Sequence, residues 1–137
     1  MNKFIKGIIE TIRYNLGDIP ETEYYIEDHI EAGNMDVVRR LIENDRSLIQ
    51  RRDPFGNSLL HIAVQERQAA IVKFLIEAGC DVNARDEDGQ TPLHVEATFP
   101  SKEIAEMLIQ KGADPRIEDN HGDTASSIAR KKESSNR

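Results

Sequence analysis

Apolar residues recur along the chain at the spacing of one face of an α-helix, in segments too short to be stable alone. The clearest two segments place apolar side chains at i, i+1, i+4 and i+5. They are Ile71, Val72, Leu75 and Ile76, then Ile104, Ala105, Leu108 and Ile109. A helix with a single apolar stripe must bury it against a neighbour. The pattern therefore predicts helix pairs that stack, each pair completing the core of the next.

The expected elements follow from this periodicity and from the polar breaks between the apolar segments. We expect paired helices over residues 22–32 and 35–44, over 58–66 and 69–77, and over 91–99 and 102–110. Another helix should precede them and one short helix should follow. The fold class is therefore all-α.

One block of sequence occurs twice. Asp53-Pro-Phe-Gly-Asn-Ser-Leu-Leu-His61 is followed by Asp86-Glu-Asp-Gly-Gln-Thr-Pro-Leu-His94, and the two blocks begin 33 residues apart. The glycines that close the two units, Gly79 and Gly112, have the same separation. A fixed period of this length, with turn residues before two helical patterns, is typical of a stacked helical repeat.

The residue types in the block suit its predicted geometry. Gly56 and Gly89 stand where a tight turn needs a positive φ. Thr91 can cap the first helix of its unit, and a proline is tolerated at the first helical position that follows. His61 and His94 share one place in the repeat, where a neutral imidazole can bridge the backbones of adjacent loops.

The motif Asp-x-x-Gly-x-Thr-Pro-Leu-His, followed by Gly-Ala-Asp, resembles the ankyrin repeat. The resemblance implies a solenoid of helix-turn-helix units with β-hairpin-like loops, two full repeats between degenerate terminal repeats, and an extra N-terminal helix. It also implies protein–protein recognition through a concave groove. The expected divisions are a capping helix over 1–18, a repeat domain over 19–133 (19–52, 53–85, 86–118 and a partial cap over 119–133), and a frayed tail over 134–137.

The N-terminal helix has three interpretations. Phe4, Ile8 and Ile12 recur at helical spacing with basic residues on the remaining surface. The helix could cap the first repeat, bind a partner, or lie on a membrane surface. Capping is favoured because a solenoid must cover its terminal apolar face.

Composition and charge narrow the class of protein. The 137 residues fit one domain, and the net charge of −7 disfavours nucleic acid or an anionic membrane as a partner. The lone Cys80 excludes an internal disulfide and fits a reducing compartment, so a cytoplasmic location is expected. We also expect the protein to be a monomer. Cys80 takes the place of Ala113 in the next unit, which indicates a small packed residue.

The sequence contains no catalytic, metal-binding or phosphate-binding motif, so neither enzymatic activity nor a cofactor is expected. Asp86-Glu-Asp88 lacks the residue order of a calcium loop. Asn83 matches the ankyrin loop position that asparagine hydroxylases modify, although an Asn that stabilises its loop explains it equally. The predicted function is a protein-binding module. The alternative is an inhibitor that acts by occlusion, such as an immunity protein or a shortened relative of the NF-κB inhibitors.

The partner is expected to contact the loop tips and the exposed ends of the first helices. These positions hold Phe55, Asn57, Gln65, Glu66, Glu87, Asp88, Gln90, Thr98 and Phe99. Two aromatic rings with an acidic rim would form a binding centre for a basic partner. The alternative is that Phe55 folds over Pro54 and Phe99 tucks against Pro100.

Glu96 departs from the repeat pattern. It falls at a small-residue position that Ala63 and Ala129 occupy in neighbouring units. A carboxylate there must find a partner or turn toward solvent, because burying it unpaired is costly. We expect Glu96 to reach a basic residue of the C-terminal cap, with Arg130 as the leading candidate. The alternative is that Glu96 lies in the groove and contacts a protein partner.

Overall fold

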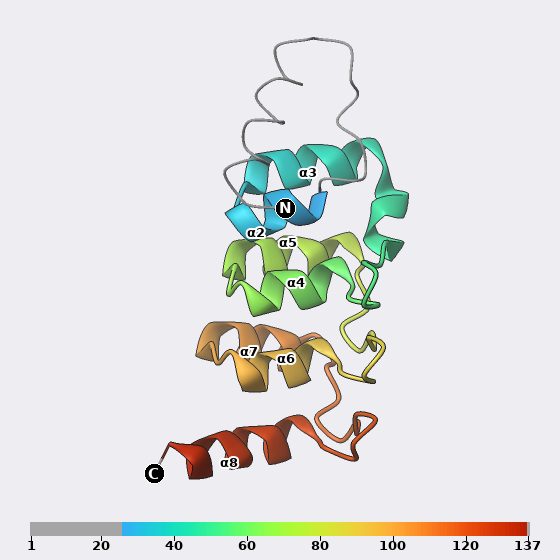
Figure 1. The fold of residues 1–137 in the computed structure, drawn as a ribbon. Coiled ribbons are helices and arrows are strands. Elements are labelled where there is room, and N and C mark those ends of the chain that lie inside the picture. The colour runs from blue at the N-terminus through green and yellow to red at the C-terminus, as the bar shows by residue number, and fades with distance from the viewer. Residues whose placement is uncertain (1–25, 137) are drawn as a thin grey trace.

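Seven α-helices and one 3-10 helix make up the regular structure of residues 26–136, which the computed structural model describes (Figure 1). The predicted N-terminal helix lies outside these residues. The elements are α2 (Ile26–Ala32), α3 (Met35–Asn44), the 3-10 helix η2 (Arg46–Gln50), α4 (Leu59–Gln65), α5 (Ala69–Ala78), α6 (Pro92–Thr98), α7 (Lys102–Gln110) and α8 (Ala125–Ser135).

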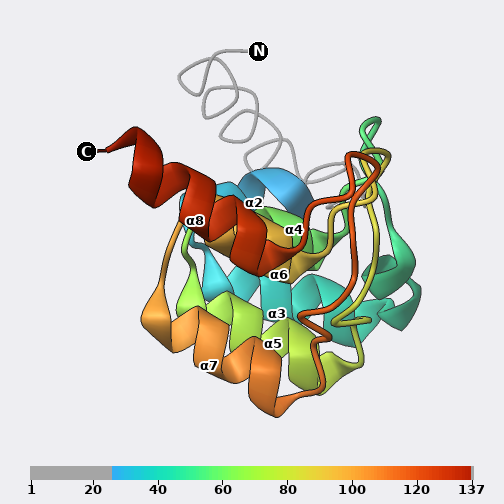
Figure 2. The ribbon, with the colours of Figure 1, turned by 90° about the horizontal axis from the view of Figure 1, so that it is seen from below.

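The helices form a column of antiparallel pairs. The pairs are α2 with α3, α4 with α5, and α6 with α7. Along the column, α2, α4, α6 and α8 form an inner row, and α3, α5 and α7 form an outer row. Viewed down the column, the long loops between pairs gather at one end of the helices (Figure 2). The predicted all-α solenoid is therefore confirmed.

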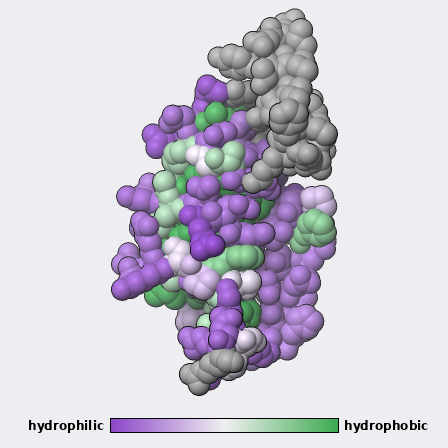
Figure 3. Space-filling model, turned by 60° about the vertical axis from the view of Figure 1, so that its left-hand side comes forward, coloured by the Kyte–Doolittle hydropathy of each residue, from purple (hydrophilic) through white to green (hydrophobic). Residues whose placement is uncertain are grey.

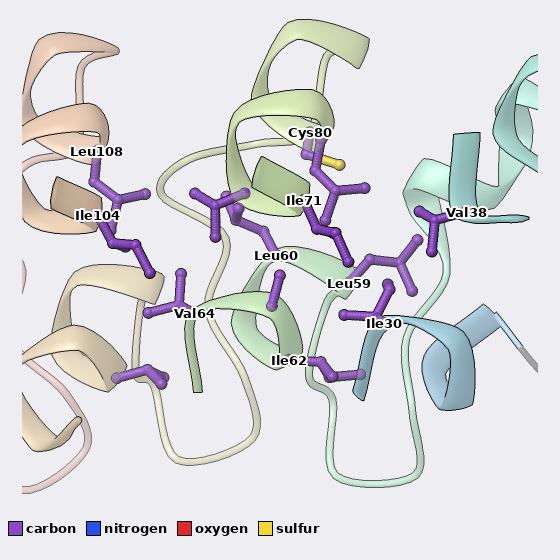
Figure 4. Close-up of a cluster of buried hydrophobic side chains, with 14 of the residues drawn as sticks. Ile30, Val38, Leu59, Leu60, Ile62, Val64, Ile71, Cys80, Ile104 and Leu108 are labelled. Atoms are coloured by element: carbon purple, nitrogen blue, oxygen red, sulfur yellow. The ribbon is translucent and has the colours of Figure 1, made fainter. Parts of the chain in front are cut away.

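The core runs through the whole column as the apolar stripes predict. Ile71, Val72 and Leu75 of α5 are all buried. Figure 4 shows buried side chains from successive pairs, such as Leu60 of α4 and Leu108 of α7, in one continuous apolar layer. Each pair contributes only part of that layer, so its stability depends on the neighbouring pairs.

The C-terminal helix is longer than expected. The sequence predicts one short helix and a frayed tail over 134–137, but α8 has 11 residues and continues to Ser135. The polar segment is tied to the rest of the stack. Lys131 Nζ lies 2.7 Å from Asp123 Oδ1, and Lys132 Nζ donates to the carbonyl of Thr98. These contacts explain why basic residues without apolar neighbours remain helical.

The loop after α3 contains an element that the sequence did not predict. Residues 44–52 include one residue more than the equivalent later loops. The structure uses this length for η2, where the Asp45 carboxylate accepts from the N–H of Ser47 at 3.0 Å. Leu48 of η2 is buried against the first helix pairs.

The turn that joins the two helices of a pair holds a different residue at the same position in each of the three pairs. Gly33 has φ +77° and Arg67 has φ +54°, whereas Pro100 stands at the equivalent place in the third pair. The left-handed region is open to glycine but costs roughly 1 kcal/mol for other L-residues. The turn at Arg67 is therefore strained.

Replacing Arg67 with glycine is expected to raise the free energy of unfolding by about 0.5 kcal/mol. Relief of the positive φ exceeds the extra conformational entropy that glycine gives the unfolded chain. Urea denaturation would measure the change. Arg67→Ala is the matched control, since it removes the same side chain but keeps a Cβ. Equal stability of the two variants would show that the backbone is not strained here.

Candidate protein-binding surface

The loops between helix pairs are held by a carboxylate at their first residue. Asp53 Oδ1 accepts from the N–H of Phe55 at 2.9 Å and from that of Asn57 at 2.8 Å. Asp86 and Asp119 form the same two bonds in the next loops. Gly89 takes φ +76° in this turn, where an added Cβ would lie 2.5 Å from Asn120 Oδ1. The turn geometry predicted from Asp-x-x-Gly is thus confirmed.

The repeated histidines bridge adjacent loops as predicted. His61 Nδ1 accepts from the N–H of Ser58 at 3.1 Å, and Nε2 lies 2.8 Å from the carbonyl oxygen of Gln90. A backbone N–H can only donate and a carbonyl can only accept, so the imidazole is neutral with its proton on Nε2. His94 forms the same bridge between Thr91 and the carbonyl of Asp123.

Acid is expected to weaken the fold through His61. Burial lowers the pKa of His61 below 6.5, and this outweighs the hydrogen bond to Gln90 and the nearby Asp86 carboxylate, which raise it. His61 therefore binds a proton more readily in the unfolded chain than in the folded one. Its contribution to the free energy of unfolding is complete above about pH 6.5 and is lost as the pH falls below that value.

Urea denaturation at several pH values between about 7.5 and 5.5 would test this prediction, because carboxylates remain ionised over that range. The wild-type chain should lose more stability than His61→Gln over the same interval. Parallel profiles for the two proteins would contradict the prediction.

A second bridge between loops was not anticipated. Arg52 Nη1 donates to the carbonyl of Gly56 at 2.8 Å and to that of Arg85 at 2.9 Å. Arg85 does the same one repeat later, reaching Gly89 at 3.1 Å and Glu118 at 3.0 Å. The signal was present in the sequence, because the two arginines are 33 residues apart and each precedes the Asp of its block.

The predicted contact residues fall into two separate groups. Phe55, Asn57, Glu87, Asp88 and Gln90 belong to the loops that precede α4 and α6, and we call them the loop row. Gln65, Glu66, Thr98 and Phe99 lie at the C-terminal ends of α4 and α6, and we call them the helix-end row. The two rows lie at opposite ends of the inner helices (Figure 2). The inner helices between the two rows, α4 and α6, each have seven residues and are roughly 10 Å long.

The two aromatic rings therefore do not form a single centre. Phe55 is 71% exposed, so it is not buried by folding over Pro54. Phe99 is 38% exposed and ends α6 immediately before Pro100. Figure 3 shows that hydrophilic side chains cover most of the described surface on the face it presents, with hydrophobic ones in small groups between them. A partner that used both rings would have to span the length of the inner helices.

Comparison with known sequences agrees with the stacked architecture. A family profile described as "Ankyrin repeats (3 copies)" matches residues 29–86 and 60–136. The chain belongs to the ankyrin repeat family. Ankyrin repeats generally mediate protein–protein interaction, and they are not themselves enzymes.

The chain is also similar to a much larger protein. It is 40% identical over 52 residues to palmitoyltransferase akr1 of Schizosaccharomyces pombe (strain 972 / ATCC 24843). The aligned segment covers 38% of this chain and 8% of that protein. The likeness thus concerns a short segment of that protein.

Two residues of the loop row serve the ankyrin loops themselves. Asn57 Nδ2 donates to Asp53 Oδ2 at 3.0 Å. The Gln90 side chain interacts with the carboxyl group of Asp119 in the next loop. Burial raises the pKa of this carboxyl, but hydrogen bonds from the backbones of Asp123 and His121 and from the Gln90 side chain lower the pKa overall. Asn57 and Gln90 are therefore committed within the fold, which leaves Phe55, Glu87 and Asp88 as the free side chains of the loop row.

Asn83 joins two successive repeats. Its Nδ2 donates to the carbonyl of Gly112 at 3.1 Å, and its Oδ1 accepts from the N–H of Asp114 at 2.8 Å. The stabilising role predicted for this asparagine is confirmed by both contacts.

Glu96 has a different partner from the one that the sequence suggested. Its Oε1 accepts from the backbone N–H of Ser101 at 3.1 Å, and no ion pair joins it to Arg130 within residues 26–136. In the preceding repeat the equivalent N–H, that of Gln68, donates to the carbonyl of Ala63 at 3.0 Å. Pro100 cannot adopt the left-handed turn that this bond requires. The Glu96 carboxylate replaces the missing carbonyl.

We expect Glu96→Ala to lower the free energy of unfolding by about 1 kcal/mol and to preserve the fold. The loss is that of one charged hydrogen bond at a half-buried turn. Thermal and urea unfolding followed by circular dichroism would measure it. Glu96→Gln keeps an acceptor and should lose less. An unfolded Glu96→Ala variant would show instead that the whole stack depends on this residue.

Cys80 behaves as a packed core residue. Its side chain is buried at the same place as Ala113 in the next repeat, and burial raises the pKa of the thiol to about 11. Little reactive thiolate is present at neutral pH. Within residues 26–136, no group of three His, Cys, Asp or Glu side chains is placed to hold a metal ion. No helix in the described part of the chain combines the length and apolar character needed to cross a membrane.

Proposed function

We propose that this ankyrin chain is a binding module that docks a protein partner between its loop row and its helix-end row. The observation that carries the proposal is the rigid presentation of exposed side chains at both ends of the inner helices. Phe55 and Phe99 are exposed, and within residues 26–136 the only other exposed large apolar side chain is that of Ile109 on α7. Exposed aromatic residues on a rigid scaffold are typical anchors of protein interfaces.

The loop row is ready to bind without rearrangement. Arg52 and Arg85 fix the spacing of successive loops, and His61 and His94 fix each loop to the helix behind it. A surface that is already ordered loses little conformational entropy on association. This supports a role in recognition for the loops as well as in the fold.

The charge of the surface favours a basic partner. Glu66, Glu87 and Asp88 are exposed carboxylates, and the whole chain carries a net charge of −7. Complementary charge accelerates association and excludes acidic competitors such as nucleic acid. The same charge favours the alternative function, an inhibitor whose acidic surface covers a basic site on its target. Loss of the partner's activity at equimolar ratio would support inhibition.

We propose that the protein acts as a cytoplasmic monomer. The lone, buried and unreactive Cys80 suits a reducing compartment. Sedimentation equilibrium of the purified chain and imaging of a tagged chain in its source cells would test the two halves of this proposal.

Site-specific photo-cross-linking tests the binding module directly. A photoreactive phenylalanine analogue would replace Gln65 or Glu66 of the helix-end row, or Asp88 of the loop row. Lys73 and Gln110, which are exposed on the outer helices, would be the matched control positions. In an extract of the source cells, one protein should cross-link from the two rows and not from the outer helices. Cross-linking to no protein at any position would refute the proposed function.

A further inference from the structure

Phe55 lies next to the tip of the following loop, which carries the acidic residues Glu87 and Asp88. The N–H of Glu87 donates to the carbonyl of Phe55 at 3.2 Å, which brings the tips of the two loops together. The Glu87 side chain also lies against Gly56, where an added Cβ would be 3.0 Å from Glu87 Cγ. Asp88 follows and occupies the same place in its repeat as Phe55. An exposed ring and two exposed acidic residues are thus carried by the tips of two adjacent loops.

These carboxylates have no cation within the described chain. Ion pairs within residues 26–136 include those of Glu27 with Arg51, Asp114 with Arg116 and Asp123 with Lys131, and no ion pair there involves Glu87 or Asp88. The loop segments 52–57, 85–90 and 118–123 together contain seven carboxylates and two guanidinium groups. Both guanidinium groups are bound to backbone carbonyls. Even with Asp123 paired to Lys131, these loops carry more carboxylates than cationic groups.

The third loop holds both acidic residues in position. The N–H of Asn120 donates to the carbonyl of Asp88 at 2.9 Å, and Asn120 Nδ2 donates to the carbonyl of Glu87 at 2.8 Å. Because the backbone on each side is fixed, the two side chains are offered to a ligand at a low entropic cost.

We propose that Phe55, Glu87 and Asp88 bind an arginine side chain of the protein partner, which lies in an exposed basic segment. The guanidinium group would stack on the Phe55 ring and direct its N–H groups to the carboxylates. A similar stacking occurs within this chain, where the guanidinium carbon of Arg39 lies 5.6 Å from the centre of the Phe74 ring. The inference rests on the proposed function and specifies the chemistry of the partner.

Arginine fits this site better than other occupants. A lysine ammonium is more strongly hydrated and cannot lie flat on a ring while it donates to a carboxylate. A purely apolar side chain would use the ring but leave two carboxylates partly desolvated and unpaired. An acidic ligand would be repelled.

The test compares fluorescein-labelled nona-arginine and nona-lysine, titrated with the full chain and followed by fluorescence anisotropy. The wild-type chain should bind nona-arginine about fivefold more tightly than nona-lysine, since both carry the same charge and only arginine stacks well. Phe55→Ala should remove this preference. Glu87→Gln combined with Asp88→Asn should weaken the binding of both peptides by about tenfold or more.

Two variants on α7 serve as matched controls. Ile109→Ala removes another exposed large apolar side chain, and Glu106→Gln neutralises another exposed carboxylate. Both should bind the two peptides as the wild type does. Circular dichroism would verify that Phe55→Ala is folded, which its 71% exposure predicts.

Equal affinity of the wild type for the two peptides would overturn the inference, as would a preference for arginine that survives in Phe55→Ala. If cross-links still form from the two rows, such a result contradicts only the arginine site. The protein would still be a binding module, and its partner would bind through side chains other than arginine. Absence of all cross-links would instead remove the binding module itself.

Discussion

Replacing Leu60 with alanine is expected to lower the free energy of unfolding by about 3 kcal/mol. Leu60 is fully buried on α4, at the centre of the apolar layer in Figure 4. Helix α4 packs on α5 within its own pair and on α2 and α6 along the column. A cavity at Leu60 therefore weakens the packing of successive pairs as well as that within one pair. Such a loss is a large part of the stability of a small domain.

Urea denaturation followed by circular dichroism would measure the loss. Leu60→Met, which keeps the volume, should cost less than about 1.5 kcal/mol. Ile109→Ala is the exposed control and should change the stability little, because that side chain is 48% exposed on α7. A loss below about 1 kcal/mol for Leu60→Ala would show that the repeats do not share one cooperative core.

His61→Ala is expected to cost about 2–3 kcal/mol. The substitution removes a buried side chain and leaves the carbonyl of Gln90 and the N–H of Ser58 without their partner. Because one of these groups belongs to the next repeat, the loss weakens the junction between repeats as well as the cap of α4. Its effect should therefore exceed that of a typical single hydrogen bond.

His121 provides the matched control for His61. It is exposed at the tip of the third loop, and His121→Ala should change the stability by less than about 0.5 kcal/mol. Calorimetric or urea unfolding of both variants would give the comparison. Similar losses for His61→Ala and His121→Ala would mean that the bridge between loops contributes nothing to stability.

The sequence predicted the local elements well because their causes lie within a few residues. Helix α3 has the predicted bounds, and so does α7. The cap by Thr91 and the turn at Gly89 each depend on contacts within four residues. The His61 bridge reaches across repeats, but a fixed period of 33 residues made the neighbour's position predictable.

Features that depend on the three-dimensional stack were missed. A base of the C-terminal cap, with Arg130 as the leading candidate, was the expected partner of Glu96. The carboxylate instead accepts from the N–H of Ser101, which has lost its usual carbonyl partner because Pro100 changes the turn. The tail was expected to fray, since its own residues are polar, but Lys132 reaches the end of α6 and extends α8. In both cases the partner is set by the path of the backbone in space.

Some features of the candidate surface likewise followed from the sequence, and others only from the tertiary structure. By itself the sequence determined the repeat unit, the all-α class, the buried stripes and the positions that face outward, because a periodic pattern of apolar and polar residues fixes which side of each element is buried. Only the tertiary structure decided that Phe55 and Phe99 lie at opposite ends of the inner helices, and that Phe55 shares its surroundings with Glu87. The physical reason is that the distance between side chains on different loops depends on how the helices between them are oriented and stacked.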